Sequence, residues 1–412
     1  MAMTRVAIIG AGAAGMFAAI QAAQAGASVV VFEAGSKPLA KVAISGGGRC
    51  NVTHDCVDPV AFAERYPRGS RELRAAFAHF QASDLMQWFA GAGVALKTEA
   101  DGRVFPTSDD SATICDIIRQ TARQAGVVLR TQHKVRSLSQ SDQGFSLRLD
   151  QDLVQADRVL LASGGARQGM ALAEGLGHRI MDPVPALFTV RCRDTLLKDL
   201  SGIASPARLQ VQAQGAKHSH SAEGPLLITH WGLSGPALLK ASSWAARDLA
   251  AAGWKGTLTV DWCPQWPEHD LRQRLRDLRS EHPRKQVAST PLAGIPRRLW
   301  ERLIERAGLE GVWATASNAI LEQLLSTLRR SSLAITDKGP FSEEFVVCGG
   351  VARKEVDWRR MESRLVPGLH IAGEALDQDG LTGGFNLQAA WTTGWIAGRA
   401  MAQPLAGSVC SN

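Results

Sequence analysis

Val6-Ala-Ile-Ile-Gly-Ala-Gly-Ala-Ala-Gly15 is a short apolar run followed by glycines at positions 10, 12 and 15. The apolar run is too short for a helix and is typical of a strand that is buried on both faces. In this spacing Gly10 makes the tight turn, Gly12 lets the backbone approach a pyrophosphate, and Gly15 lets the next helix pack against the strand. The stretch therefore predicts a strand–turn–helix unit that binds a dinucleotide.

The residues that follow complete a βαβ unit. We expect a helix over residues 13–25, whose unpaired N–H groups at Ala13 and Ala14 face the phosphates. A second strand is expected over residues 28–32, and Glu33 with Ala34 stands at its tip. A carboxylate at that place accepts hydrogen bonds from ribose hydroxyls and repels a 2′-phosphate. The alternative, a glycine-rich turn without a ligand, explains the glycines but not the acid in register.

A second glycine-rich block lies near the C-terminus. A short strand delivers Gly373-Glu374, and Gly383-Gly384 then open a helix over residues 386–401. The carboxylate can bind a polyol hydroxyl, and the start of a helix stabilises negative charge. Reduction of a flavin places negative charge on one edge of its ring, which such a helix favours. The two blocks together indicate FAD, with the ADP half at one and the flavin half at the other.

The loop Lys41-Val-Ala-Ile-Ser-Gly-Gly-Gly-Arg-Cys-Asn-Val-Thr-His54 carries the most reactive side chains. Its three glycines let the backbone pass close to a flat ligand, and Arg49 can pair with a phosphate or a substrate oxygen. Cys50, beside an arginine and backbone N–H groups, is a candidate proton donor with a lowered pKa, or else a buried apolar side chain. Asn51 is expected to fix the loop or the flavin by hydrogen bonds. His54 is the other candidate proton donor, or a structural histidine.

Composition excludes several classes of protein. The chain has 412 residues, of which 45% are hydrophobic and 21% charged, and no apolar run approaches the ~18 residues of a membrane span. The N-terminus enters the first strand without a secretory leader, so we expect a cytoplasmic protein without membrane contact. The seven cysteines form no C-x-x-C pair. We therefore expect reduced thiols and no metal site.

The net charge of +7 comes mostly from arginine. A solvated arginine-rich surface explains it, and so does a polyanionic partner such as RNA. The basic residues gather in a helical stretch near residues 266–330. Its candidate phosphate contacts are Arg272, Arg274, Arg276, Arg279, Arg284, Lys285, Arg297, Arg298, Arg329 and Arg330.

The order of patterns predicts a nucleotide-binding domain that is interrupted by an insertion. Residues 1–190 form its first part, including a helical stretch over residues 70–89, and residues 336–412 its last part. Residues 191–265 alternate short strands with turns, which predicts an inserted β unit. The basic stretch, assigned to residues 266–335, is an inserted helical unit. The fold class is α/β.

Several blocks along the chain resemble one family. They are Ser45-Gly-Gly-Gly-Arg-Cys-Asn-Val-Thr-His54, Gly102-Arg-Val-Phe-Pro106, Thr229-His-Trp-Gly-Leu-Ser-Gly-Pro236, Cys348-Gly-Gly-Val351 and Gly383-Gly-Phe-Asn386. The chain is similar to the BaiN/YhiN-type NAD(P)/FAD-dependent oxidoreductases, also called aminoacetone oxidase-like FAD-binding flavoproteins. The resemblance implies a Rossmann-like fold of the two-dinucleotide-binding-domain flavoprotein type, with a β-barrel-like insert and a helical insert.

The resemblance also assigns FAD contacts to residues from every block. They are Gly10, Gly12, Ala13, Ala14, Gly15, Glu33, Ala34, Lys41, Gly47, Gly48, Arg49, Cys50, Asn51, Val135, Ser163, Gly164, Gly165, Gly373, Glu374, Gly384, Phe385, Asn386 and Leu387.

Family members are linked to reduction of carbon–carbon double bonds, in steroid-type substrates and in a uracil ring of ribosomal RNA. We expect an enzyme that passes hydride from FAD to an unidentified unsaturated substrate, while Cys50 or His54 protonates the neighbouring carbon. Because the chain has no second strand–G-x-G-x-x-G–helix unit, NAD(P)H is expected to bind only transiently. Two alternatives stay open: an amine oxidase that uses O2, and an RNA-binding protein whose flavin is structural or a sensor. The sequence does not give the oligomeric state.

Overall fold

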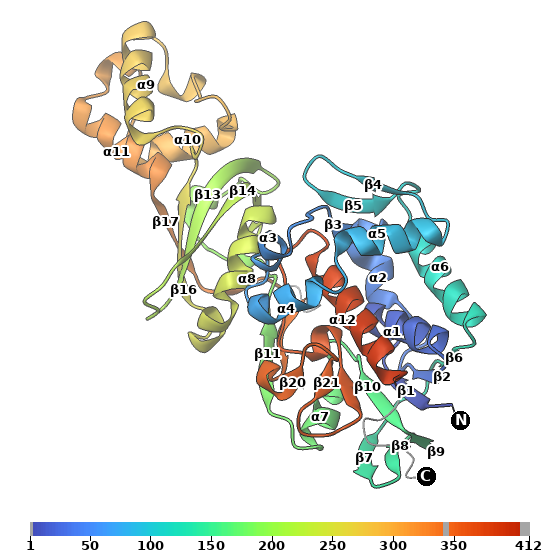
Figure 1. The fold of residues 1–412 in the computed structure, drawn as a ribbon. Coiled ribbons are helices and arrows are strands. Elements are labelled where there is room, and N and C mark those ends of the chain that lie inside the picture. Colours follow the sequence, from blue (N-terminus) through green and yellow to red (C-terminus); the bar gives the residue numbers. More distant parts are fainter. Residues whose placement is uncertain (1–2, 341–345, 404–412) are drawn as a thin grey trace. The chain divides into compact units, whose positions relative to one another are not determined.

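The chain folds into two units, shown as ribbons in Figure 1. The computed structural model describes residues 3–340 and 346–403. Residues 1–183 and 346–412 make up unit 1, and residues 184–345 make up unit 2. Unit 2 is thus inserted into the sequence of unit 1. The predicted division of the insertion into a β unit and a helical unit stays a prediction.

A seven-stranded sheet in the order β20-β21-β22-β10-β1-β2-β6 forms the centre of unit 1. Five strands run parallel: β22 (Leu369–Ile371), β10 (Arg158–Leu161), β1 (Arg5–Ile9), β2 (Ser28–Phe32) and β6 (Val128–Arg130). The short antiparallel strands β20 (Val356–Asp357) and β21 (Glu362–Ser363) extend one edge. The central strands β1 and β10 are buried along nearly their whole length, because a helix over residues 13–24 contacts β1 and β2 and two strands of a small separate sheet, over residues 144–156, contact β1 and β10. The predicted Rossmann-like class is confirmed.

Helices α1 (Ala13–Gln24) and α12 (Phe385–Met401) cross at very short distance. A Cβ atom added at Gly394 would lie 2.5 Å from the Ala14 carbonyl oxygen, and one at Gly398 would lie 2.4 Å from that of Ala18. Only glycine on one helix facing alanine on the other permits this approach. The crossing joins the N-terminal and C-terminal glycine blocks in one layer.

Smaller elements surround this core of unit 1. Residues 70–89, expected as one helical stretch, form two helices, α4 (Ser70–Phe77) and α5 (Ala82–Gly91), because Gln81 and Asp84 make a capping box that starts a new helix. The other elements are listed here by their bounds: α2 (Ala40–Ile44), β3 (Thr53–His54), α3 (Pro59–Ala63), β4 (Leu96–Thr98), β5 (Arg103–Pro106), α6 (Ser111–Gln124), β7 (Ser137–Ser141), β8 (Gly144–Arg148), β9 (Leu153–Ala156), α7 (Arg167–Glu174), β11 (Ile180–Pro185) and β19 (Val347–Val351).

Unit 2 contains a seven-stranded antiparallel sheet in the order β17-β16-β13-β14-β15-β12-β18. Its members are β12 (Val190–Arg191), β13 (Ala204–Ala213), β14 (His220–Thr229), β15 (Gly232–Ser234), β16 (Gly256–Asp261), β17 (Ser331–Ile335) and β18 (Asp337–Lys338), with helix α8 (Pro236–Ala251) packed on β13 and β14. The end strands β17 and β18 are separated by one residue, Thr336, so one segment pairs with both edges. The barrel-like character of this insert stays a prediction.

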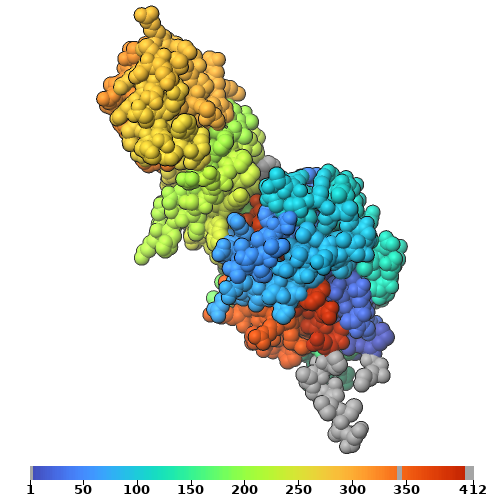
Figure 2. All heavy atoms as spheres, turned by 45° about the horizontal axis from the view of Figure 1, so that its top comes forward, coloured from blue at the N-terminus to red at the C-terminus, as the bar shows by residue number. Residues whose placement is uncertain are grey.

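Three helices form a lobe within unit 2, drawn in yellow and orange in Figure 2. They are α9 (Glu268–Glu281), α10 (Arg297–Arg306) and α11 (Asn318–Arg329), and all three lie in the basic stretch of residues 266–330 for which the sequence predicts helices. Their buried leucines pack around Trp300 and Trp313, whose indole N–H groups donate to the Val287 carbonyl and the Thr290 hydroxyl. The lobe therefore has an apolar centre of its own.

Candidate cofactor site

The absence of a side chain has a different effect at each glycine of the first turn. Gly10 has a φ of +107°, and a Cβ there would lie 2.4 Å from the Ala162 carbonyl oxygen, next to β10. A Cβ at Gly15 would lie 1.9 Å from the carbonyl oxygen of Gly10, so this glycine fixes the distance between α1 and the turn. A Cβ at Gly12 meets no atom within 4 Å. Gly12 thus leaves an open surface at the start of α1, where no side chain caps the first N–H groups.

Glu33 is held beside this turn by two backbone hydrogen bonds. Its Oε2 accepts from the N–H of Ala11 at 2.9 Å, and its Oε1 accepts from the N–H of Gly35 at 2.7 Å. Each carboxylate oxygen has a second lone pair, so both can still accept from a ligand hydroxyl. The neighbouring Ala34 is exposed.

The loop after α2 has an unusual backbone. Gly46, Gly47 and Gly48 have φ values of 58°, 71° and 87°, and Cys50 follows with a φ of 61°. Added Cβ atoms at Gly47 and Gly48 meet nothing within 4 Å, so this part of the loop presents bare backbone. On the C-terminal side, the Asn51 amide donates to the carbonyls of Thr53 and Val104 and accepts from the N–H of Gly384 in the orientation that satisfies both of its ends.

The C-terminal block meets the same region. Lys41 Nζ lies 2.6 Å from Glu374 Oε2, and a Cβ at Gly164 would lie 3.5 Å from that same oxygen. A Cβ at Gly384, the N-cap of α12, would lie 2.4 Å from the Thr53 carbonyl oxygen, so β3 passes directly beside the helix start. The helix start has no side-chain cap.

Side chains behind α12 hold its first turn in place. Asn386 accepts from the N–H of Gly380 and donates to its carbonyl, each at 2.8 Å. Phe385 is buried, and its carbonyl accepts from the Tyr66 hydroxyl at 2.6 Å. Leu387 is half-buried. The bare N–H groups of this turn are therefore fixed in direction before any ligand binds.

The remaining predicted residues lie at the end of β10 and near α7. Gly164 has a φ of +64°, and a Cβ at Gly165 would lie 3.1 Å from Val347. The Ser163 hydroxyl is buried without a hydrogen-bond partner in the described residues. Val135 is buried and its carbonyl accepts from Gln168 at 3.4 Å.

The predicted chemistry of Cys50 needs a correction. Its side chain has 0% exposure, and burial raises the pKa of the thiol to about 12 instead of lowering it. The prediction of an activated thiol is wrong, because the Cys50 side chain turns into the core while the arginine beside it turns outward. In this conformation the Cys50 sulfur has no surface for a ligand.

His54 is half-buried beside the start of α12. Its ring stacks on Phe385 with centroids 4.7 Å apart, and its Nδ1 lies 3.2 Å from the Gly383 carbonyl oxygen. Because a carbonyl only accepts, Nδ1 carries the hydrogen, and Nε2 is the atom that takes up or releases a proton. Burial lowers the pKa of His54. Its catalytic role stays a prediction.

Arg49 was expected to face a phosphate or a substrate oxygen. In the structure its Nη1 lies 2.7 Å from Glu99 Oε1 and 3.4 Å from Asp109 Oδ1, and its guanidinium lies 4.0 Å from the centroid of the Phe105 ring. Sequence reasoning did not find Glu99, Phe105 or Tyr66. The conspicuous Gly102–Pro106 block next to Glu99, and the fact that Tyr66 is the chain's one tyrosine, were signals for them.

The residues present fit FAD. The backbone at Gly12, which no side chain covers, lies at the start of α1. The equally uncovered backbone of Gly47 and Gly48 lies in the loop that contacts the start of α12. Two carboxylates, Glu33 and Glu374, stand at strand ends where hydroxyl groups of a dinucleotide are bound. The buried, unpartnered hydroxyl of Ser163 adds a polar atom for a ligand in the same region.

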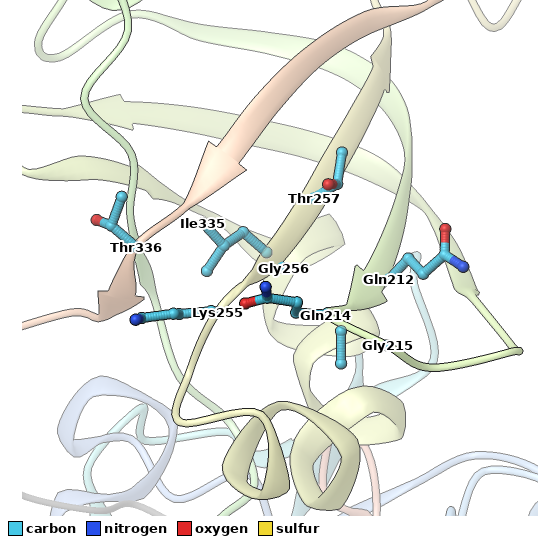
Figure 3. A pocket seen from close by; sticks show the side chains of 9 residues that line it. Gln212, Gln214, Gly215, Lys255, Gly256, Thr257, Ile335 and Thr336 are labelled. Atoms are coloured by element: carbon cyan, nitrogen blue, oxygen red, sulfur yellow. The ribbon is translucent and has the colours of Figure 1, made fainter.

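A separate hollow of about 530 Å³ lies in unit 2 and contains none of the predicted site residues. Figure 3 shows it between the ends of β13, β16 and β17, with Gln214, Lys255 and Thr336 around it. Its polar side chains are exposed, so it is a shallow surface feature. In residues 3–340 and 346–403, no three His, Cys, Asp or Glu side chains are arranged to hold a metal, and no helix there is long and apolar enough to cross a membrane.

Known proteins match nearly the whole chain. The family described as HI0933-like protein Rossmann domain matches residues 4–400. A 3-dehydro-bile acid delta(4,6)-reductase of Clostridium scindens is 30% identical, covering 97% of this chain and all of the relative. A ribosomal RNA dihydrouridine synthase of Escherichia coli is 32% identical, covering 94% of this chain and 95% of the relative.

Solved structures share the fold at low identity. A 3-ketosteroid-delta4-(5alpha)-dehydrogenase of Rhodococcus jostii has a TM-score of 0.51 at 15% identity, over 97% of each chain. A flavocytochrome c3 fumarate reductase has a TM-score of 0.50 at 17% identity, over 97% of this chain and 78% of the other.

The fold and the site define an FAD-dependent oxidoreductase with a Rossmann-like domain. Within that class, the chain belongs to the HI0933-like family, which the sequence resemblance had indicated under its BaiN/YhiN-type name.

Proposed function

We propose that the protein reduces a carbon–carbon double bond in a ring substrate, with FAD as the resident cofactor and NAD(P)H as the transient electron donor. The observation that carries the proposal is the meeting of three segments at one place: the loop over residues 41–51, the end of β10 and the start of α12. Asn51 of the loop accepts from Gly384 at the start of α12, and Glu374 lies between Lys41 of the loop and Gly164 after β10. The two relatives named for reductions of ring systems support this type of reaction.

Bound FAD would supply two-electron hydride transfer, which no amino-acid side chain supplies. The chain's own residues orient the cofactor and stabilise its negative charge. Glu33 and Glu374 accept hydrogen bonds from hydroxyl groups, and the uncapped first turn of α12 stabilises negative charge with its N–H groups. The bare backbone of Gly47 and Gly48 allows a flat ring to lie against the loop.

Reduction of a double bond by hydride leaves a carbon that must accept a proton. We assign the proton donor to His54, because its ring is partly exposed whereas the thiol of Cys50 is enclosed. Its Nδ1–H is engaged with the Gly383 carbonyl, so the donated proton would come from Nε2 of the protonated ring. The stacking on Phe385 keeps the ring plane fixed.

For the substrate we propose the uracil ring of ribosomal RNA, with a steroid-type ring as the competing substrate. Conversion of uridine to dihydrouridine adds two hydrogens across a ring double bond, the same change that a delta(4,6)-reductase name describes. Arg284 and Lys285 support an RNA partner, because both are exposed and make no ion pair in the described residues. Most other candidate phosphate contacts in the lobe are already paired with carboxylates, for example Arg274 with Glu281 at 3.0 Å.

The first experiment is a visible spectrum of the purified protein, followed by NADH or NADPH without oxygen. A flavin band that bleaches with either nicotinamide and recovers on adding unmodified ribosomal RNA, but only slowly in air, supports the proposal. Rapid recovery in air without RNA supports the amine-oxidase alternative instead. A flavin that no nicotinamide bleaches contradicts the proposed donor, and a colourless protein that takes up no FAD contradicts the proposal as a whole.

A further inference from the structure

The glycine loop of the cofactor site rests on a small three-stranded sheet. The sheet has the order β3-β5-β4, and the loop leads directly into β3. Phe105 on β5 is fully buried under the loop: a Cβ added at Gly46 would lie 2.9 Å from its ring. The Arg49 guanidinium covers the same ring at 4.0 Å from the centroid. The loop is therefore seated on Phe105 through Gly46 and Arg49.

The contacts with Phe105 have to hold the loop in a backbone conformation that it would not adopt without them. Gly46, Gly47 and Gly48 all have positive φ, and free glycines populate many other conformations. Cys50 has a positive φ of 61°, which costs free energy for a residue with a side chain. Anchors on either side of Cys50 have to supply that free energy. On one side the anchor is Asn51, and on the other it is Arg49.

Glu99 is the main partner of the Arg49 anchor. Its Oε1 accepts from Arg49 at 2.7 Å and its Oε2 accepts from Arg103 at 2.8 Å, so one carboxylate joins the loop to β5. The Glu99 backbone also belongs to the hairpin, since its N–H donates to the Arg103 carbonyl at 2.8 Å. Asp109 is a second, weaker partner at 3.4 Å and is shared with Lys97. Glu99 is thus the nearer of the two carboxylates that join Arg49 to the hairpin.

We propose that Glu99 is a positioning residue: through Arg49 it holds the Gly46–Gly48 backbone in the one shape that a flat cofactor ring can lie against. The inference rests on the proposed function, because the ring is that of FAD. Glu99 does not contact the cofactor. It sets the fraction of molecules whose loop is ready to bind, and the apparent dissociation constant is the intrinsic one divided by that fraction.

The test compares Glu99→Gln with a matched variant, Asp101→Asn, in the full chain. Asp101 is on the same hairpin and pairs with Arg103 at 2.7 Å, but it does not contact Arg49. We expect Glu99→Gln to weaken FAD binding to the apoprotein about tenfold, as when the ready fraction falls to about a tenth. The visible spectrum of the flavin should shift as well, because its ring then meets a different backbone. Asp101→Asn should bind FAD like the unchanged protein and show its spectrum.

A double-mutant cycle separates positioning from general destabilisation. If Glu99 acts through Arg49, Glu99→Gln adds nothing to the effect of Arg49→Gln on FAD affinity. Additive losses would overturn the inference, and so would an unchanged affinity and spectrum in Glu99→Gln with only a lower melting temperature. Absence of FAD binding in the unchanged protein is a different result, since it contradicts the proposed function itself.

Discussion

The ammonium of Lys41 lies 2.6 Å from the carboxylate of Glu374, a residue 333 positions later in the chain. The pair joins the loop over residues 41–51 to the C-terminal block. Lys41 is largely exposed, so the pair contributes little to the free energy of unfolding, on the order of 1 kcal/mol or less. Its importance is local, because it places the Glu374 carboxylate beside Gly164.

Replacement of Glu374 by Gln should weaken FAD binding at least several-fold while the melting temperature stays nearly unchanged. The reason is that the amide keeps the shape but is a weaker hydrogen-bond acceptor than a carboxylate. Titration of the apoprotein with FAD, followed by flavin fluorescence, measures the effect. Lys37→Gln, at an exposed position four residues before Lys41, serves as the control. Equal FAD affinity in Glu374→Gln and the unchanged protein would contradict this assignment.

Substitution by alanine should have different effects at the second and third glycines of the turn. Gly12→Ala is expected to fold normally, since its φ is −80° and the added Cβ has free space, but to lose FAD affinity by about tenfold or more. Gly15→Ala should lower the free energy of unfolding by about 2 kcal/mol or more, because its Cβ would lie 1.9 Å from the Gly10 oxygen. Urea unfolding and FAD titration of both variants check this. A stable Gly15→Ala protein with normal FAD binding would show that α1 can move away from the Gly10 turn without loss of the site.

The pH dependence of substrate reduction distinguishes the two candidate proton donors. Burial lowers the pKa of His54 below its ordinary value of 6.5, so a rate that needs protonated His54 falls as the pH rises through a value under 6.5. The Cys50 thiol, with its pKa at about 12, stays protonated and would leave the rate flat up to pH 9 or so. We expect the falling profile, and its loss in His54→Asn. A flat profile in the unchanged protein would assign the proton to another group.

A buried histidine makes unfolding pH-dependent. His370 is fully enclosed, and burial lowers its pKa to about 4 from an ordinary 6.5. The unfolded chain therefore binds a proton below pH 6.5 that the folded chain does not bind until about pH 4. Stability is complete above pH 6.5 and is lost as the pH falls toward 4, by about 2 kcal/mol between pH 7 and pH 5.

Urea unfolding at those two pH values measures the loss. In His370→Asn the pH-dependent part should shrink by about 2 kcal/mol, whereas replacement of the exposed His79 should leave it unchanged. An unaltered pH dependence in His370→Asn would mean that other buried groups cause it.

Binding of ribosomal RNA should depend on salt through the helical lobe. Replacement of Arg284 and of Lys285 by Gln should each reduce the slope of log affinity against log salt by about 1. Arg274→Gln is the matched control in the same lobe, because Arg274 is paired with Glu281. RNA binding with unchanged slopes would remove these two residues as phosphate contacts.

The sequence determined the elements with strong local signals. Gly10 and Gly15 stand where an added side chain would meet backbone atoms, and the helical pattern of the basic stretch predicted α9, α10 and α11, since such a pattern is a property of the chain itself. The break between α4 and α5 was missed, because the capping of Gln81 by Asp84 depends on a bend that periodicity does not reveal. The carboxylates expected to contact FAD, Glu33 and Glu374, were also readable from their places after strands.

Only the tertiary structure decided which way the side chains of the loop turn. Arg49 and Cys50 are neighbours in sequence, yet one packs outward on Phe105 and Glu99 while the other is enclosed, with opposite consequences for their chemistry. The direction follows from the positive φ at Cys50 and from a hairpin some fifty residues later. A pKa depends on desolvation and on charges near in space, and neither is encoded in the order of adjacent residues.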